Sequence, residues 1–165
     1  MADGRVRDAV AEDAGRLAEI YNHYVVHTIV TFGSEPVTAA AMAADIEAAD
    51  DRRPLLVWED PGGAVAGFAM AGSWQARCAF ANTVETTVYL DPERVGGGRG
   101  TRLYAALLDR LRAAGLRTAL GGIALPNPAS VALHEKLGFR KVAHLERVGD
   151  KLGREIDVGY WQLIL

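Results

Sequence analysis

Four glycines fall within five residues near the middle of this chain, at Gly96, Gly97, Gly98 and Gly100. The segment before them, Glu85–Leu90, is rich in β-favouring residues, and leucines recur after them at helical spacing. A strand is therefore expected to lead through a glycine turn into a helix. Free N–H groups gather at a helix start, where the helix dipole is positive, so this geometry suits a phosphate or another anion.

The spacing of this loop departs from the two common phosphate-binding patterns. A Walker loop ends in Lys followed by Ser or Thr, whereas this loop ends in Arg99, Gly100 and Thr101. A dinucleotide-binding loop needs a third glycine, at the place where this chain has Thr101 or Leu103. A plain surface loop is the alternative interpretation, but the flanking strand and helix argue against it.

The other reactive residues indicate neither a metal site nor a covalent nucleophile. His23 and His27 have the i,i+4 spacing that can bind zinc, but Tyr24 stands where a zinc-protease motif has Glu. The single cysteine, Cys78, excludes an internal disulfide, and no Gly-x-Ser-x-Gly motif is present. We therefore expect no metal and no serine or cysteine nucleophile.

Length and composition indicate one ordinary domain, which we expect to span positions 1–165, and half of the residues are hydrophobic. The net charge of −3 argues against nucleic-acid binding. No apolar run approaches the roughly 20 residues of a membrane span, and the polar start Met1–Asp8 lacks the apolar core of a signal peptide. We expect a cytoplasmic protein with neither nucleic-acid nor membrane partners.

Periodicity and turn signals predict the elements that position the glycine loop. The expected strands are Gly4–Val10, Leu55–Glu59, Ala64–Trp74, Asn82–Leu90, Thr118–Ala124, Lys141–Val148 and Ile156–Leu163. The expected helices are Ala11–Val26, Thr38–Asp50, the run from the glycine loop to Ala114-Gly115, and Ala129–Leu137. Thr38 suits an N-cap, and Pro128 suits the first helical position.

This order of elements predicts a mixed α/β domain. The helix after the glycine loop joins neighbouring strands, so that connection is expected to be parallel and right-handed. The segment His27–Phe32 is β-branched and ends at Gly33-Ser34, while Gln75–Ala81 reads as a loop and Gly149–Gly153 as a turn.

Two stretches resemble the GNAT superfamily of N-acetyltransferases. Val88–Pro92 leading into Gly96–Gly100 is similar to the pyrophosphate loop of that family, and Asn127–Phe139 is similar to its second cofactor motif. Their order and spacing both match. The resemblance implies an α/β (α+β) fold with a mixed, mostly antiparallel, splayed sheet flanked by helices. It also implies acetyl-CoA as donor and a primary amine as acceptor.

A narrower resemblance covers almost the whole chain and concerns the branch of phosphinothricin, methionine sulfoximine and methionine sulfone acetyltransferases. It rests on residues between Thr31 and Thr38, on Thr83–Glu85, on Leu133–Glu135, and on residues between Val148 and Gln162. Relatives in this branch are dimers, so the resemblance implies a homodimer. The apolar C-terminal end is either core or a subunit contact.

The chain also departs from the pattern of this family. The first residue of the loop is usually Gln or Arg, and this chain has Val95 there, with Arg94 one place earlier. The Arg-rich segment before Thr83 is reduced to Arg77. Its other places hold Gln75, Phe80 and Ala81. Arginines at those places would bind the carboxylate or phosphinate of an acceptor through paired hydrogen bonds.

The resemblance implies direct acetyl transfer with two catalytic residues. Glu85 is the expected general base, either directly or through a water, because burial is needed to raise its low pKa toward that of an amine. A solvated strand glutamate is the alternative. His134, where many relatives have Tyr, is expected to protonate the leaving thiolate, and a packed helix histidine is the alternative.

The remaining expected site residues divide between donor and acceptor. The expected acetyl-CoA-binding residues are Val88, Tyr89, Leu90, Val95, Gly96, Gly97, Gly98, Arg99, Gly100, Thr101, Asn127 and Lys136. The expected acceptor-binding residues are Phe32, Glu35, Trp74, Gln75, Arg77, Thr86 and Thr87. The alternative interpretations are that Asn127 is only a turn residue, that Lys136, Arg99 and Arg102 are solvated, and that Phe32 and Trp74 belong to the hydrophobic core.

We therefore expect an acetyl-CoA-dependent enzyme that acetylates the amino group of a small amino-acid-like acceptor. A second reading keeps the donor and takes a polyamine, an aminoglycoside or a protein N-terminus as acceptor. A third is a CoA-binding module without turnover. Dependence of the acceptor on Arg77 separates the first reading from the second.

Overall fold

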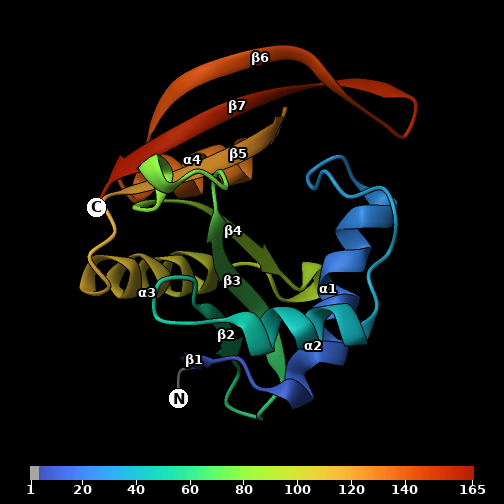
Figure 1. Ribbon diagram of the computed structural model, residues 1–165. Coiled ribbons are helices and arrows are strands. Elements are labelled where there is room, and N and C mark those ends of the chain that lie inside the picture. Colours follow the sequence, from blue (N-terminus) through green and yellow to red (C-terminus); the bar gives the residue numbers. More distant parts are fainter. Residues whose placement is uncertain (1–3) are drawn as a thin grey trace.

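The computed structural model describes residues 4–165, in which seven strands form one sheet flanked by four α-helices (Figure 1). The strands are β1 (Arg5–Asp8), β2 (Leu55–Glu59), β3 (Val65–Ser73), β4 (Thr83–Leu90), β5 (Thr118–Leu125), β6 (Arg140–Lys151) and β7 (Arg154–Ile164). The helices are α1 (Ala14–His27), α2 (Ala39–Ala48), α3 (Arg99–Ala113) and α4 (Pro128–Lys136), with short 3₁₀ turns η1 (Ala11–Asp13), η2 (Cys78–Phe80) and η3 (Pro92–Arg94). The first three residues of Met1–Asp8 lie outside the described residues.

The sheet has the order β1-β2-β3-β4-β5-β7-β6, and every described neighbouring pair is antiparallel except β4 and β5. This parallel pair is the one that the glycine loop and α3 connect, so the predicted parallel connection is confirmed. The expected mixed, mostly antiparallel sheet flanked by helices is confirmed as well. No helix within residues 4–165 combines the length and the apolar character needed to cross a membrane.

The two faces of the sheet carry separate hydrophobic cores. In β2, Leu56 and Trp58 pack with the leucines of α3, while Leu55 and Val57 pack with α1 and α2. Because side chains alternate along a strand, these two sets lie on opposite faces. Helix α3 therefore covers one face, and α1 and α2 cover the other (Figure 1).

Helix ends follow the local signals in the sequence. The hydroxyl of Thr38 accepts a hydrogen bond from the Ala41 N–H at 3.1 Å, as an N-cap should. Pro128 is the first residue of α4, after Asn127 at the N-cap. Helix α3 ends before Gly115, which has a φ of +75° and so suits a left-handed C-cap.

Several predicted boundaries are wrong, and contacts remote in sequence explain them. The predicted turn Gly149–Gly153 is a tight turn at Leu152 and Gly153, whose φ angles are +52° and +70°. Gly149, Asp150 and Lys151 instead extend β6, because they pair with residues of β7. The first helix, predicted as Ala11–Val26, spans Ala14–His27, and bends rather than a strand follow it.

The parallel pair of β4 and β5 separates part of the way along its length. The two strands pair only from Thr83 opposite Thr118 to Glu85 opposite Leu120, although β4 continues to Leu90. Past Glu85, the side of β4 that would face β5 has no strand partner. This opening is the splay that the resemblance implied.

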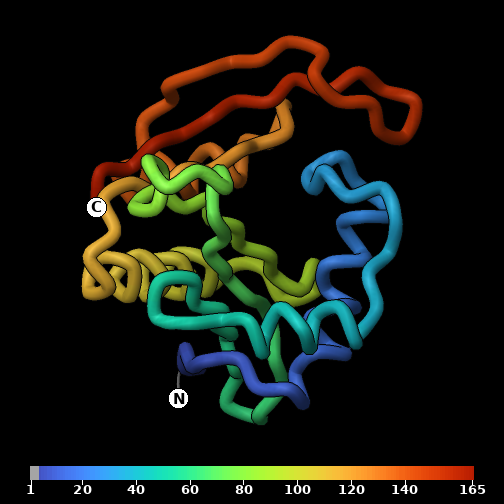
Figure 2. The backbone as a smooth tube through the Cα atoms, in the orientation of Figure 1, coloured from blue at the N-terminus to red at the C-terminus, as the bar shows by residue number. Residues whose placement is uncertain are grey.

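The tip of the β6–β7 hairpin reaches the loop that follows α1 (Figure 1 and Figure 2). The buried Lys151 side chain donates from Nζ to the Thr31 carbonyl at 2.9 Å and lies 3.4 Å from the Tyr24 carbonyl. Burial lowers the pKa of Lys151. Lys151 thus fastens the C-terminal hairpin to the loop that precedes α2, across the end of the sheet.

We predict that Lys151→Met loosens this connection. The buried Thr31 carbonyl would lose its donor, which costs about 1–3 kcal/mol of unfolding free energy. Urea unfolding measures that loss, and hydrogen exchange should rise in residues 28–34. The exposed Lys136 on α4 provides the control, and Lys136→Met should leave both measurements unchanged. Equal protection of residues 28–34 in Lys151→Met and in the unaltered protein would contradict the prediction.

Candidate active site

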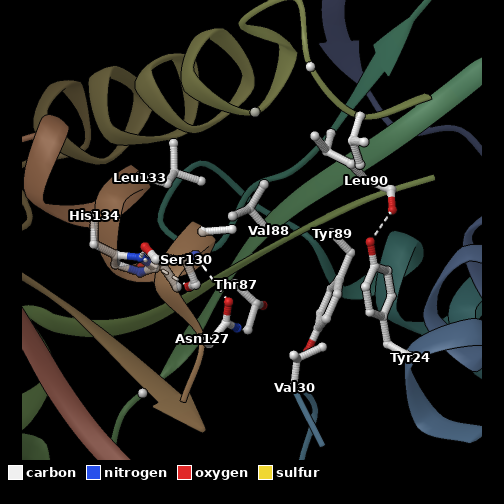
Figure 3. A pocket seen from close by; sticks show the side chains of 16 residues that line it. Tyr24, Val30, Thr87, Val88, Tyr89, Leu90, Asn127, Ser130, Leu133 and His134 are labelled. Atoms are coloured by element: carbon white, nitrogen blue, oxygen red, sulfur yellow. Dashed lines mark hydrogen bonds between the residues drawn. The ribbon is translucent and has the colours of Figure 1, made fainter. Parts of the chain in front are cut away.

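A cavity of about 340 Å³ fills the opening between β4 and β5 (Figure 3). Its walls come from the second half of β4, the glycine loop, β5, the start of α4 and the end of α1. The lining includes Tyr24, Val30, Thr87, Val88, Tyr89, Leu90, Val95, Gly96, Gly100, Gly122, Asn127, Ser130 and His134. We call this cavity the slot. An elongated slot beside an unpaired strand suits a ligand arm that binds like an added strand.

The glycine loop closes one end of the slot with exposed backbone. Gly96, Gly97 and Gly98 have φ angles of +93°, +61° and +74°, a conformation that side chains with a Cβ rarely adopt. Gly98 is the N-cap of α3 and offers no side-chain cap. Within residues 4–165, the N–H groups of Gly100 and Thr101 bond to no backbone or side-chain acceptor. They are therefore available to a pyrophosphate.

The arginines near this loop are already engaged. Arg94 donates to Asp60 at 2.9 Å, and Arg99 donates to the same carboxylate at 3.3 Å. The Trp58 indole also donates to Asp60, and this hydrogen bond, together with the two arginines, lowers the pKa of Asp60. Both arginines therefore hold the loop against Asp60, and binding of acetyl-CoA by Arg99 stays a prediction.

Asn127 has one half of its amide occupied and the other half free. Its Oδ1 accepts from the Ser130 N–H at 3.1 Å and so caps α4. Its Nδ2 donates to no group within residues 4–165, and the side chain lines the slot (Figure 3). The turn reading and the binding reading are thus compatible. The other cofactor candidate on α4, Lys136, is exposed and lies outside the slot lining.

Glu85 lies half-buried on the face of the sheet that is opposite to α3. Its Oε1 is 3.0 Å from the point where a Cβ on Gly122 would sit, beside the Tyr160 ring. Within the described chain no hydrogen bond reaches this carboxylate, and burial raises its pKa. Its negative charge in turn contributes to the raised pKa of Tyr160, after burial. A carboxylate without partners and with a raised pKa has the properties of a general base.

His134 lies on the other face of the sheet, against α3. Its Nε2 is 2.3 Å from the position a Cβ on Gly121 would take, so it packs directly on that glycine. Its Nδ1 contacts the Ser130 carbonyl at 2.8 Å and its Nε2 contacts the Tyr104 hydroxyl at 3.1 Å. Burial lowers the pKa of His134, and the Ser130 carbonyl raises it by less. The residue is both packed and part of the slot lining.

The structure does not bring the expected acceptor residues together. Trp74 and Gln75 line a separate hollow of about 540 Å³, which β4, β5, β6 and β7 border, and the Trp74 ring packs edge-on against Phe80. Phe32 is 53% exposed, so the core reading for it is wrong. Of the remaining candidates, Glu35 and Arg77 are exposed and line neither cavity.

The two threonines of this set differ in direction. Both line the slot, and Figure 3 labels Thr87. The Thr86 hydroxyl is buried against Tyr104 and the Leu120 carbonyl, so it bonds toward α3. A role of either threonine in binding the acceptor stays a prediction.

Sequence reasoning missed several residues of the site. The Tyr24 hydroxyl donates to the Leu90 carbonyl at 2.6 Å and forms a wall of the slot (Figure 3). Tyr160 lies beside Glu85, and Tyr104 beside His134. In the sequence, Tyr24 and Tyr104 occupy apolar positions of amphipathic helices, so nothing in the pattern indicates a function for their hydroxyls. No group of three or more His, Cys, Asp or Glu side chains in residues 4–165 is arranged to hold a metal ion.

Known proteins are similar in sequence to this chain over nearly its whole length. It is 42% identical to the phosphinothricin N-acetyltransferase of Streptomyces viridochromogenes over 95% of this chain and 85% of that protein. It is 37% identical to an L-methionine sulfoximine/L-methionine sulfone acetyltransferase of Pseudomonas paraeruginosa over 97% and 94%. An acetyltransferase structure from Salmonella typhimurium, solved with acetyl-CoA, superposes with a TM-score of 0.95 at 36% identity, covering 99% of this chain and 95% of that one.

The fold, the slot and these relatives together define an N-acetyltransferase that uses acetyl-CoA as its co-substrate. The chain belongs to the Acetyltransferase (GNAT) family, whose sequence model matches residues 17–139. The expected resemblance to the phosphinothricin and methionine sulfoximine branch is confirmed by the two relatives.

We predict that Gly121→Ala destabilises the protein by about 1–3 kcal/mol, because overpacking a closed interior forces side chains to move. The new Cβ would lie 2.3 Å from His134 Nε2. Gly62→Ala is the control, since a Cβ there meets nothing within 4 Å. Chemical unfolding compares the two variants, and equal midpoints for both would show that His134 does not pack on Gly121.

Proposed function

We propose that this enzyme acetylates the amino group of a small amino-acid-like acceptor, of the phosphinothricin, methionine sulfoximine or methionine sulfone type. The transfer is direct, with Glu85 as general base. The observation that carries this proposal is the half-buried Glu85 carboxylate, which has no hydrogen-bond donor among residues 4–165 and stands at the last paired position before the strands separate.

The slot and the glycine loop support the donor half of the proposal. The pantetheine arm would lie along Val88, Tyr89 and Leu90, where β4 has lost its neighbour. The pyrophosphate would meet the N–H groups between Gly96 and Thr101, and Asn127 Nδ2 would donate to the arm. Val95 lines the slot and supplies apolar wall in place of a charged or amide side chain.

The two titratable residues would act from opposite faces of the sheet. Glu85 accepts a proton from the acceptor ammonium, directly or through a water, on the face opposite α3 and beside Tyr160. The free amine then attacks the acetyl carbon, and the bond from that carbon to sulfur breaks. His134 stands on the other face and supplies the proton that the thiolate sulfur takes up.

The acceptor class rests on the relatives and on the hollow beside the slot. The relatives named above act on phosphinothricin and on methionine sulfoximine or sulfone. The hollow offers aromatic and amide groups, Trp74, Phe80 and Gln75, to a short side chain. A different acceptor of the same donor, such as a polyamine, is favoured only by the exposure of Arg77 and the lack of other arginines in that loop.

We predict that Glu85→Gln lowers kcat/KM for the acceptor on the order of 10²–10⁴-fold, because the base is lost while its shape is kept. Release of free thiol from acetyl-CoA is measured with phosphinothricin, methionine sulfoximine, methionine sulfone, spermidine, an aminoglycoside and a short peptide. Because burial raises the pKa of Glu85, activity of the unaltered enzyme should fall with decreasing pH at a higher pH than for an ordinary glutamate.

This acidic limb should be absent in Glu85→Gln. Glu47→Gln, which changes an exposed carboxylate on α2, should keep both rate and profile. Rates no faster than acetyl-CoA hydrolysis with every acceptor, or full activity in Glu85→Gln, would contradict the proposal. Turnover confined to spermidine, the aminoglycoside or the peptide would replace the acceptor class and keep the donor.

We further propose a homodimer, located in the cytoplasm. The hairpin of β6 and β7 at the end of the sheet exposes large apolar side chains, among them Val142, Leu145, Val148 and Leu152. An apolar patch at a sheet edge favours burial against another chain, and a twofold dimer is the commonest form. The single cysteine supports a reducing location.

Sedimentation at micromolar concentration should give about twice the chain mass of 17.7 kDa. Val148→Asp places a charge in the exposed apolar hairpin and should shift the protein toward the monomer. Val10→Asp alters another exposed valine, which lies before α1 and outside the hairpin, and serves as the control. A monomer in the unaltered protein would contradict the proposal.

A further inference from the structure

A continuous chain of polar contacts runs beneath the slot on the α3 face. The Thr86 hydroxyl lies 3.1 Å from the Leu120 carbonyl and 2.6 Å from the Tyr104 hydroxyl. The Tyr104 hydroxyl lies 3.1 Å from His134 Nε2, and His134 Nδ1 lies 2.8 Å from the Ser130 carbonyl. Both ends of the chain are therefore backbone carbonyls, which only accept.

The number of available protons decides which of these contacts are hydrogen bonds. The four contacts need one proton each. Thr86 and Tyr104 contribute one each, and a neutral imidazole contributes one more, which leaves one contact without a proton. An imidazolium supplies the missing proton, and all four contacts become hydrogen bonds. The chain is complete only when His134 is protonated.

The Tyr104 hydroxyl can reverse the direction of its hydrogen bond with His134, from donor to acceptor. Beside a neutral His134, Nδ1 keeps its proton for the Ser130 carbonyl, and the Tyr104 hydroxyl can donate to the bare Nε2. Beside an imidazolium, Nε2–H donates to Tyr104, whose own O–H turns to Thr86, while Thr86 donates to the Leu120 carbonyl. Only the two hydroxyl hydrogens rotate, and no heavy atom has to move.

We propose that Tyr104, supported by Thr86, is a positioning residue for acetyl transfer, because its reversible hydroxyl lets the buried His134 take up a proton and release it to the leaving thiolate. This inference rests on the proposed function of His134. The acceptor ammonium loses two protons in becoming an amide, and the thiolate sulfur gains one proton from His134 Nε2. One of the two lost protons recharges His134 and the other is released to solvent, which closes the proton balance.

Within residues 4–165, the polar side chains that contact the His134 ring are hydroxyls. Tyr104 is the titratable group that faces the imidazole from α3, and Thr86 is the polar group that faces it from β4. The Phe139 ring packs at 5.0 Å. On α4 itself the Ser130 hydroxyl lies 3.4 Å from His134 Nδ1, farther than the Ser130 carbonyl at 2.8 Å, and Glu135 is turned away to accept from the Trp161 indole. Burial raises the pKa of Tyr104, so this residue keeps its proton and acts by rotation.

The test is Tyr104→Phe, which keeps the ring that packs against His134 and removes only the hydroxyl. ¹⁵N NMR of labelled histidine follows the tautomer and titration of His134 without any acceptor. We expect the pKa of His134 to fall by about one unit or more, because a hydrogen bond to the charged form is lost. We expect kcat to fall about tenfold or more, with KM for acetyl-CoA within about twofold.

Tyr21→Phe is the matched control, because its hydroxyl also pairs with a threonine, Thr31, at 2.9 Å, but outside the slot lining. It should change neither measurement. Thr86→Val removes the second hydroxyl and should act in the same direction as Tyr104→Phe, so it carries the test if that variant does not fold. An unchanged His134 titration in the folded variant overturns the inference, and so does a shifted titration with unchanged kcat. Failure of the proposed function would appear instead as full activity in Glu85→Gln, and it would leave the NMR result standing.

Discussion

The separation of β4 from β5 after Glu85 and Leu120 is the constraint on which the site depends. Ending a ladder inside a sheet leaves backbone polar groups that must find other partners. The protein supplies two of these partners with side chains. The Thr86 hydroxyl donates to the Leu120 carbonyl where the opening begins, and the Tyr24 hydroxyl donates to the Leu90 carbonyl where it ends. Between these points the edge of β4 that would face β5 has no strand partner within residues 4–165, and this edge is where the acetyl-CoA arm is proposed to bind.

Two consecutive glycines in β5 let both faces of the sheet reach the opening. Because neighbouring residues of a strand point to opposite sides, Gly121 and Gly122 each remove one side chain from one face. The vacated space is taken by His134 on the α3 face and by Glu85 and Tyr160 on the opposite face. A larger residue at either glycine would displace one of these two titratable groups. The pair of glycines thus lets the two proposed catalytic groups approach β5 from opposite faces.

The sequence predicted those parts of the site that local signals determine. The strand, glycine turn and helix, and the start of α4 at Pro128, all stand where residue type and spacing put them. Glu85 lies in the strand predicted for it, and its role as base stays a prediction. The engagement of Arg99 with Asp60 was not predictable, because the two residues are 39 positions apart and meet only in the folded sheet. The same holds for Lys151, which reads as a turn lysine and yet binds a carbonyl 120 positions away. Tertiary contacts determine the partners of Arg99 and Lys151, and no local sequence pattern encodes those contacts.

Burial acts on the two proposed catalytic groups in opposite directions, and their partners decide the outcome. Loss of water raises the pKa of Glu85 and lowers that of His134, so both values move toward the same intermediate range. A base and an acid work best when their pKa values lie near the working pH. Within residues 4–165 no donor stabilises the charge of Glu85, which suits its proposed role as proton acceptor. His134 has acceptors for both of its N–H groups, so its charged form can exist inside the core. The same desolvation therefore suits Glu85 to the proposed role of base and leaves His134 able to carry a proton.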